Sequence, residues 1–123
     1  MPSKYETISE ETVPAAKSII ARALVLQHKM KETDVAEYLG VAQAAISKYI
    51  TEKYSDSLKS KVAEIEAKIQ DKRGLIDEYV RLIAEGKEEY VNVCICTICS
   101  VSNGIVCAFS HAIQEKAPAQ LSA

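Results

Sequence analysis

All four cysteines of the chain lie in one short stretch near its C-terminal end, in the pattern Cys94-x-Cys96-x2-Cys99-x7-Cys107. In an intracellular chain, clustered thiols favour a metal site or redox chemistry over structural cross-links. If residues 91–96 form an extended strand, the first two cysteines point to the same side, because side chains alternate along a strand. The stretch therefore predicts a metal or redox segment.

The spacing within this stretch suggests how the thiolates could meet. Cys96 and Cys99 are separated by two residues, which allows both to approach one metal ion, and the turn signal at residues 103–104 could bring Cys107 back to them. His111 is a substitute ligand if the first cysteine points elsewhere. An iron–sulfur cluster is the favoured cofactor and zinc is the second. A metal-free dithiol switch, or thiols that merely pack as small apolar groups, are the alternatives.

A second pattern, in the middle of the chain, predicts a helix-turn-helix. Val35, Ala36 and Leu39 form the inner face of a short helix, and Thr33 is placed to cap its first turn. Gly40 follows where the chain must turn sharply, since glycine takes a positive φ angle without steric cost. A small residue, a turn glycine and a branched apolar residue at this spacing are more specific than an ordinary helical hairpin.

The second helix of this pattern begins at about Gln43 and buries Ile46 and Ile50. Its other side presents the residues that could contact a ligand: Gln43, Ala44, Ser47 and Lys48. Ala42 precedes it without a side-chain cap.

At these residues the segment L-G-V-A-Q-A-A-I-S-K-Y resembles the recognition segment of lambda-repressor-like (XRE-type) helix-turn-helix transcriptional regulators. It is most similar to small predicted archaeal regulators with a cysteine-bearing C-terminal tail. The resemblance covers the motif, the preceding helix loosely, and the tail by cysteine spacing only. It implies double-stranded DNA as the partner, with Gln43, Ala44 and Ser47 facing base edges and Lys48 near phosphate. We expect Lys53 to contact phosphate too, with Lys29 and Lys31 as weaker candidates.

The remaining elements should position the two sites. Residues 1–12 should form a loose arm, either a solvated tail or a short packing segment. We expect a helix from Pro14 to about His28, with His28 capping it or lying on the surface. The apolar face of that helix comprises Ile19, Ile20, Ala23, Leu24 and Val25. A last helix should begin at Ile105.

Between the two sites, apolar residues recur at heptad spacing: Leu58, Val62, Ile65, Ile69, Ile76, Tyr79 and Ile83. Ser55 or Asp56 could cap this stem, and Gly86 should end it. Arg73 and Gly74 suggest a kink or a break. The stem is read as a long dimerising helix, with a pair of helices folded back onto the head as the alternative.

The length, composition and charge of the chain limit the class of protein to which it can belong. The chain has 123 residues, 48% of them hydrophobic, and a net charge of −2, which is not that of a generic polyanion binder. Residues 13–61 carry 8 Lys/Arg against 5 Asp/Glu, and residues 62–90 carry 5 against 8, so a mildly basic head precedes an acidic stem. A leader or spanning segment is not visible, so we expect a cytoplasmic protein.

These patterns predict a mainly α fold with a helix-turn-helix head (1–54), a long dimerising helical stem (55–86) and a small cysteine-rich C-terminal segment (87–123). The expected function is that of a homodimeric DNA-binding transcriptional regulator whose cysteine site senses redox or metal state or stabilises the tail. A protein-interaction adaptor with a structural zinc knuckle and a thiol redox switch are the alternatives. We find no catalytic constellation, so neither an enzyme activity nor a small-molecule substrate is expected.

Overall fold

The computed structural model describes residues 8–104, and within that range the chain is mainly helical and contains no strand. The expectations for Cys107, His111 and the helix from Ile105 lie outside the described residues. None of the helices in the described part is long and apolar enough to cross a membrane. In chain order the elements are η1 (Ile8–Thr12), α2 (Val13–Arg22), η2 (Ala23–Gln27), α3 (Glu32–Leu39), α4 (Gln43–Thr51), α5 (Asp56–Lys68), η3 (Gln70–Lys72), α6 (Arg73–Ala84) and α7 (Tyr90–Asn103).

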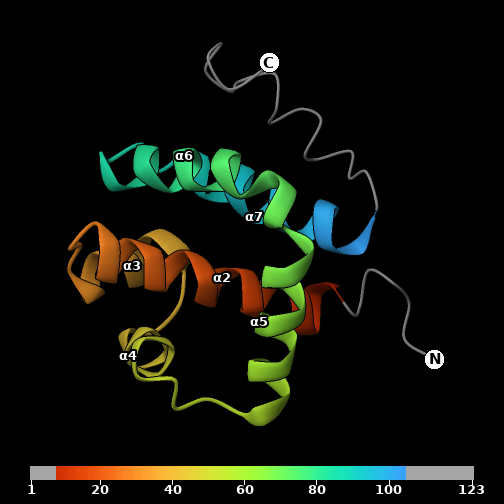
Figure 1. The fold of residues 1–123 in the computed structure, drawn as a ribbon. Helices are drawn as coiled ribbons and strands as arrows, with labels where there is room; N and C mark the ends of the chain where they lie inside the picture. Colours follow the sequence, from red (N-terminus) through yellow and green to blue (C-terminus); the bar gives the residue numbers. More distant parts are fainter. Residues whose placement is uncertain (1–7, 105–123) are drawn as a thin grey trace.

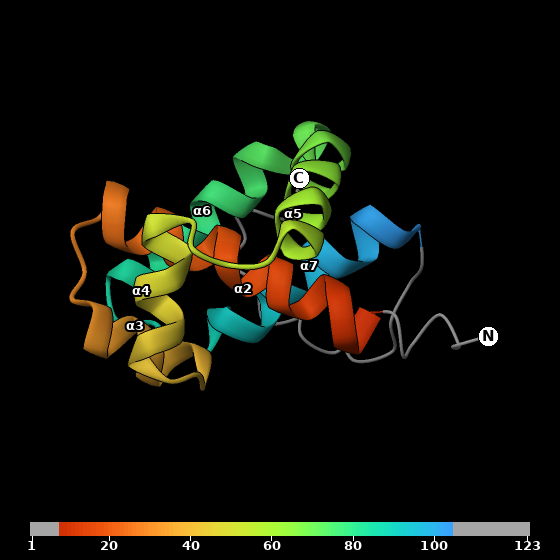
Figure 2. The same cartoon turned by 90° about the horizontal axis from the view of Figure 1, so that it is seen from below.

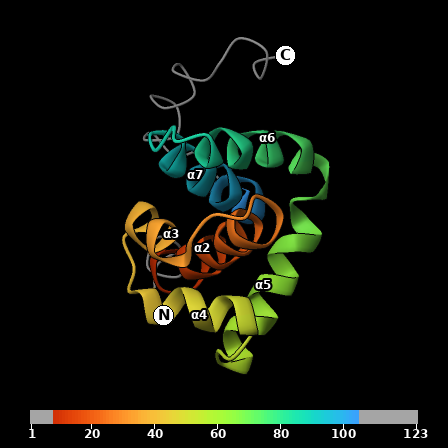
Figure 3. The same ribbon diagram turned by 90° about the vertical axis from the view of Figure 1, so that its left-hand side faces the viewer.

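The helices stack in layers around α2. Helices α6 and α7 lie side by side on one side of α2, and α4 lies on the other (Figure 1, Figure 3). Helix α5 runs along the edge of the stack and links the α4 side to the α6 side. Seen from below, the connection from α4 to α5 passes across α2 (Figure 2). Buried side chains from head, stem and cysteine segment belong to one cluster.

Helix α2 occupies the centre because its sequence combines small residues with branched ones. Pro14 stands in its first turn, as expected, where a missing amide hydrogen costs nothing. Small side chains let α4, α5 and α7 approach it closely; those that are buried are Ala15, Ala16, Ser18 and Ala21. The predicted apolar face is confirmed, since Ile19, Ile20, Ala23 and Leu24 are buried and Val25 is partly buried.

The segments on either side of helix α2 are residues 8–12 before it and the η2 turn with His28 after it. For residues 8–12 the packing segment is the alternative that holds: they form a helical turn leading into α2, and Thr12 is fully buried. At the other end the helix widens into the η2 turn, and His28 follows it as an exposed residue, as expected for a surface position.

The stem is not one long helix. It is two helices, α5 and α6, interrupted at Ile69 and η3, just before the expected break at Arg73 and Gly74. Helix α5 packs on α2 and α6 packs on α7, so the folded-back arrangement is confirmed. The heptad positions Val62, Ile65, Ile69, Ile76, Tyr79 and Ile83 are all buried within this chain.

The capping signals of the stem behave as predicted. The Ser55 hydroxyl accepts a hydrogen bond from the Leu58 amide at 3.2 Å at the start of α5. Helix α6 ends at Ala84, and Gly86 follows with a φ of 98°, its amide donating to the Ile83 carbonyl at 2.9 Å.

The cysteine segment is helical, so the expectation of an extended strand over residues 91–96 is wrong. Helix α7 is rich in apolar residues, most of which are buried where it packs against α2, α5 and α6. Its Thr97 hydroxyl donates to the Val93 carbonyl at 2.8 Å, which satisfies a buried polar group within the helix. Gly104, with a φ of 63°, ends it.

Candidate nucleic-acid interface and cysteine segment

The α3–α4 pair has the turn that the sequence predicted. Val35, Ala36 and Leu39 are buried, and Gly40 follows in the left-handed region with a φ of 67°. The Val41 amide donates to the Ala36 carbonyl at 3.0 Å and closes the end of α3. A Cβ at Gly40 would have nothing within 4 Å, so the backbone angle alone selects glycine here.

The starts of the two helices lack side-chain caps. Thr33 was expected to cap α3, and this is wrong: the helix already begins at Glu32, and the capping position is Lys31, whose side chain makes no capping hydrogen bond. Helix α4 begins after Ala42, whose methyl group cannot accept a hydrogen bond, as its sequence indicated. Both helices therefore rely on packing more than on caps for their position.

The faces of α4 separate as predicted. Ile46 is fully buried, and Ile50 is partly buried against the core. The predicted contact residues are exposed to solvent: Gln43, Ala44, Ser47 and Lys48 on α4, and Lys53 just after it. Sequence reasoning missed Tyr49, which is buried and lies edge-on to Tyr54 with ring centroids 6.1 Å apart. Burial raises the pKa of Tyr49.

The end of α4 is tied to α2 by an ion pair. Arg22 donates to the Glu52 carboxylate at 2.6 Å, and Glu52 ends α4 with a φ of 56°. The hydrogen bond from Arg22 lowers the pKa of the Glu52 carboxyl, and the charge of Arg22 acts in the same direction. Both side chains are at least partly exposed, so the pair orients the end of α4 more than it stabilises the fold.

A second contact joins the two helices of the motif on the exposed side. The Ser47 hydroxyl donates to Oε1 of Glu32, the first residue of α3, at 2.6 Å. Sequence reasoning named Ser47 and missed Glu32. The only available signal was its place at the start of the first helix of the motif, where a carboxylate is favoured by the helix dipole.

The electrostatic character of this surface is mixed. Four exposed lysines (Lys29, Lys31, Lys48 and Lys53) surround it, and none forms an ion pair with another residue in the range 8–104. Glu32 and Asp34 place acidic charge in the first turn of α3 beside them. Phosphate binding would therefore depend on a few lysines, with no continuous basic face.

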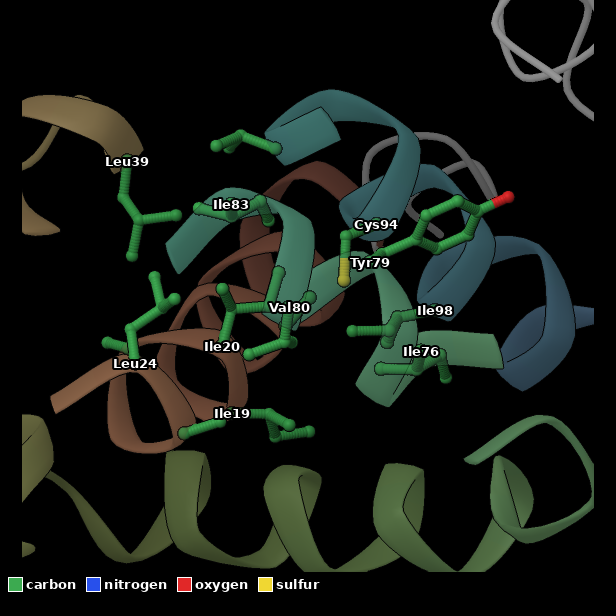
Figure 4. Close-up of a cluster of buried hydrophobic side chains, with 14 of the residues drawn as sticks. Ile19, Ile20, Leu24, Leu39, Ile76, Tyr79, Val80, Ile83, Cys94 and Ile98 are labelled. Atoms are coloured by element: carbon green, nitrogen blue, oxygen red, sulfur yellow. The ribbon is translucent and has the colours of Figure 1, made fainter. Parts of the chain in front are cut away.

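The structure separates the predicted metal ligands. Cys94 is fully buried in the core beside Tyr79, Ile76 and Ile98 (Figure 4). Burial raises the pKa of the Cys94 thiol. In this structure Cys94 packs among apolar side chains as a small apolar residue does.

Cys96 and Cys99 are the remaining predicted ligands within the described residues. They are three positions apart on α7 and so share one side of the helix, with Cys96 partly buried and Cys99 nearly buried. Within residues 8–104, no three Cys, His, Asp or Glu side chains are grouped closely enough to hold a metal ion. The predicted fourth cysteine, Cys107, lies outside the described residues.

Comparison of the chain with protein-family models, with curated proteins and with solved structures finds no match.

Proposed function

We propose that this protein is a sequence-specific DNA-binding transcriptional regulator that inserts α4 into the major groove and acts as a cytoplasmic homodimer. The observation that carries the proposal is that α4 has one buried face and one exposed polar face. Ile46 is fully buried, while polar and small side chains of the same helix are exposed opposite it, directly after the positive-φ turn at Gly40. Helix-turn-helix proteins place a helix of this kind against base edges.

The exposed residues of α4 match the chemistry of base edges. Gln43, at the start of the helix, can exchange paired hydrogen bonds with adenine N6 and N7. The Ala44 methyl group can contact a thymine methyl group, and Ser47 can make a second polar base contact. Lys48 and Lys53 would hold phosphates and fix the register of the helix.

The test is selection of bound duplexes from a random DNA library by the full chain, followed by affinity measurements at several salt concentrations. With about four lysine–phosphate contacts per head and two heads in the homodimer, log K should fall with log salt at a slope of about −7, or roughly 10⁴-fold between 50 and 200 mM. Gln43→Ala should cost about 1–3 kcal/mol at one base position and relax specificity there. Lys48→Ala should weaken all sequences about equally and reduce the slope by about 1 for each head.

The matched control is Gln70→Ala. Gln70 is exposed at the break between α5 and α6, where its side chain donates to the Glu66 carbonyl, away from α4. The Gln70→Ala variant should therefore select the same DNA sequence as the wild-type chain. Failure of the wild-type chain to enrich any sequence would refute the proposal, and an unchanged preference in Gln43→Ala would show that α4 is not the reading helix.

The cofactor is a separate part of the proposal. A cysteine-ligated iron–sulfur cluster, or zinc, would be held by Cys96 and Cys99 on one side of α7 together with Cys107, without Cys94. Such a group would report redox or metal state, or simply hold the tail in place. Iron, sulfide and zinc analysis of protein purified without oxygen, repeated on Cys99→Ser, tests this. Wild-type protein without any of these elements would instead support the thiol redox switch.

A protein-interaction adaptor is the second candidate, and the mixed charge around α4 favours it. Glu32 and Asp34 stand beside the lysines that would have to bind phosphate. An adaptor would bind DNA weakly and without sequence preference, so the selection experiment separates the two functions.

A further inference from the structure

The contact between Ser47 and Glu32 defines which hydrogen-bonding groups this part of the surface presents. Ser47 donates its single hydroxyl proton to Oε1 of Glu32 at 2.6 Å. Both side chains belong to the exposed side of the α3–α4 pair, since Ser47 is exposed and Glu32 is half-buried. They come from different helices, so the contact also holds the start of α3 against the middle of α4.

The donor capacity of the pair is used up by this bond. A hydroxyl has one proton and two acceptor sites, and a carboxylate has acceptor sites only. With the Ser47 proton directed to Glu32, the remaining sites on both side chains are acceptors. A ligand facing the pair must therefore supply a donor, and a ligand presenting acceptors would meet a negative charge without a compensating hydrogen bond.

The four base pairs differ in this respect in the major groove. Guanine presents acceptors at N7 and O6 and thymine presents the acceptor O4, whereas cytosine presents the N4 amino donor. Adenine presents an amino donor, but its N7 acceptor lies next to it. Of the four bases, cytosine is the one that offers a donor without an adjacent ring acceptor.

We propose that Glu32 is a specificity-determining residue that selects cytosine at a base adjacent to the one read by Gln43, with Ser47 fixing its carboxylate. This inference rests on the proposed DNA-binding function and adds a base-reading residue from α3. The carboxylate accepts from cytosine N4 and repels guanine and thymine, so Glu32 contributes discrimination by repulsion as well as by attraction.

The experiment compares Glu32→Gln with Asp34→Asn in the same random-library selection. Both variants remove one negative charge from the first turn of α3, so both should raise general affinity for DNA to a similar extent. Both variants introduce an amide, but only the amide of Glu32→Gln lies beside Ser47, at the place from which we propose that the base is read. We expect its preference for cytosine to fall by about 5- to 150-fold at one position, while Asp34→Asn keeps the wild-type preference.

A shorter carboxylate provides a second test that keeps the charge. Glu32→Asp retains acceptor chemistry but withdraws it by one methylene group, so its cytosine preference should fall while general affinity stays near the wild-type value. Circular dichroism and unfolding measurements on each variant establish that the fold is retained.

The outcomes separate this inference from the function on which it rests. If the wild-type chain selects a defined sequence without cytosine next to the Gln43 base, or if Glu32→Gln keeps the cytosine preference, the role of Glu32 is refuted and DNA binding stands. If the wild-type chain selects no sequence, the proposed function itself is refuted.

Discussion

Replacing Cys94 by serine should destabilise the chain without affecting any bound metal. Cys94 is 0% exposed and lies beside Tyr79 in the core, so the substitution puts a hydroxyl among apolar side chains. A buried hydroxyl without a partner costs about 1–3 kcal/mol. Helix α7 offers a partner, however, because Thr97 and Ser102 already donate to the carbonyls four residues before them at 2.8 and 2.7 Å. A serine at 94 can do the same, so we expect a loss near the lower end, about 1–2 kcal/mol.

The assay is chemical denaturation of the full chain in reducing, metal-free buffer, followed by helical circular dichroism. Cys96→Ser is the control, because its site is only partly buried and a hydroxyl there keeps access to water. It should cost less than Cys94→Ser. In metal-loaded protein the order should reverse, because Cys96→Ser loses the metal and Cys94→Ser keeps it. Wild-type stability in Cys94→Ser combined with loss of metal would refute the assignment of Cys94 to the core.

Three further predictions concern backbone angles and charge. Gly40→Ala should lower the free energy of unfolding by about 1–2 kcal/mol, because the φ of 67° is unfavourable for alanine even though space is open. Gly74→Ala in helix α6 should raise it by about 0.5–1 kcal/mol, and a change of the same sign in both variants would contradict the argument. Lys29 has a φ of 59°, so Lys29→Gly should be more stable than Lys29→Ala by about 0.5–1 kcal/mol in the same denaturation assay, and equal stability would count against strain there. Because Arg22 lowers the pKa of Glu52, the stability from their pair is present above the unfolded pKa of about 4.5 and is lost as the pH falls through the folded pKa. Thermal melts from neutral to acidic pH should show a smaller loss of stability in Arg22→Gln than in the wild type, and identical pH profiles would contradict this.

Helices α3 and α4 and the turn between them were predictable because their signals are local. A glycine that must adopt a positive φ, apolar residues at helical spacing before it, and a branched residue after it all act within about two helical turns. The structure has Gly40 in the left-handed region and Ile46 fully buried, and it leaves Gln43 and Ser47 exposed as expected.

The contacts that orient this motif were not predictable in the same way. Arg22 bonds Glu52, 30 positions away, and Ser47 bonds Glu32, 15 positions away. No periodicity or capping rule relates residues at these separations, because the contacts arise only after the helices have packed. Their omission from the predicted site follows from the short range of the signals in the sequence.

The cysteine segment was misread for a different reason. Residues 91–96, V-N-V-C-I-C, contain valine and isoleucine, which are frequent in strands, and a short apolar run does not distinguish a strand from a buried helix. The surroundings decide, because α2, α5 and α6 contact α7 and bury most of its apolar side chains. The same packing places Cys94 in the core.

The heptad pattern of the stem also could not show which surface would cover its apolar residues, and this affects how a homodimer could form. A heptad pattern indicates that a helix has an apolar stripe. That stripe can be buried equally well against a second chain or against another helix of the same chain. Here Val62, Ile65, Ile76 and Ile83 are buried within the chain, because the break at η3 lets α6 turn back onto α7. A homodimer that spaces two α4 helices about 34 Å apart on DNA must therefore use another surface. It follows that the stem sets the position of the head within one protomer, and that a group bound at the cysteine segment would be connected to α4 through the α7–α2–α4 packing.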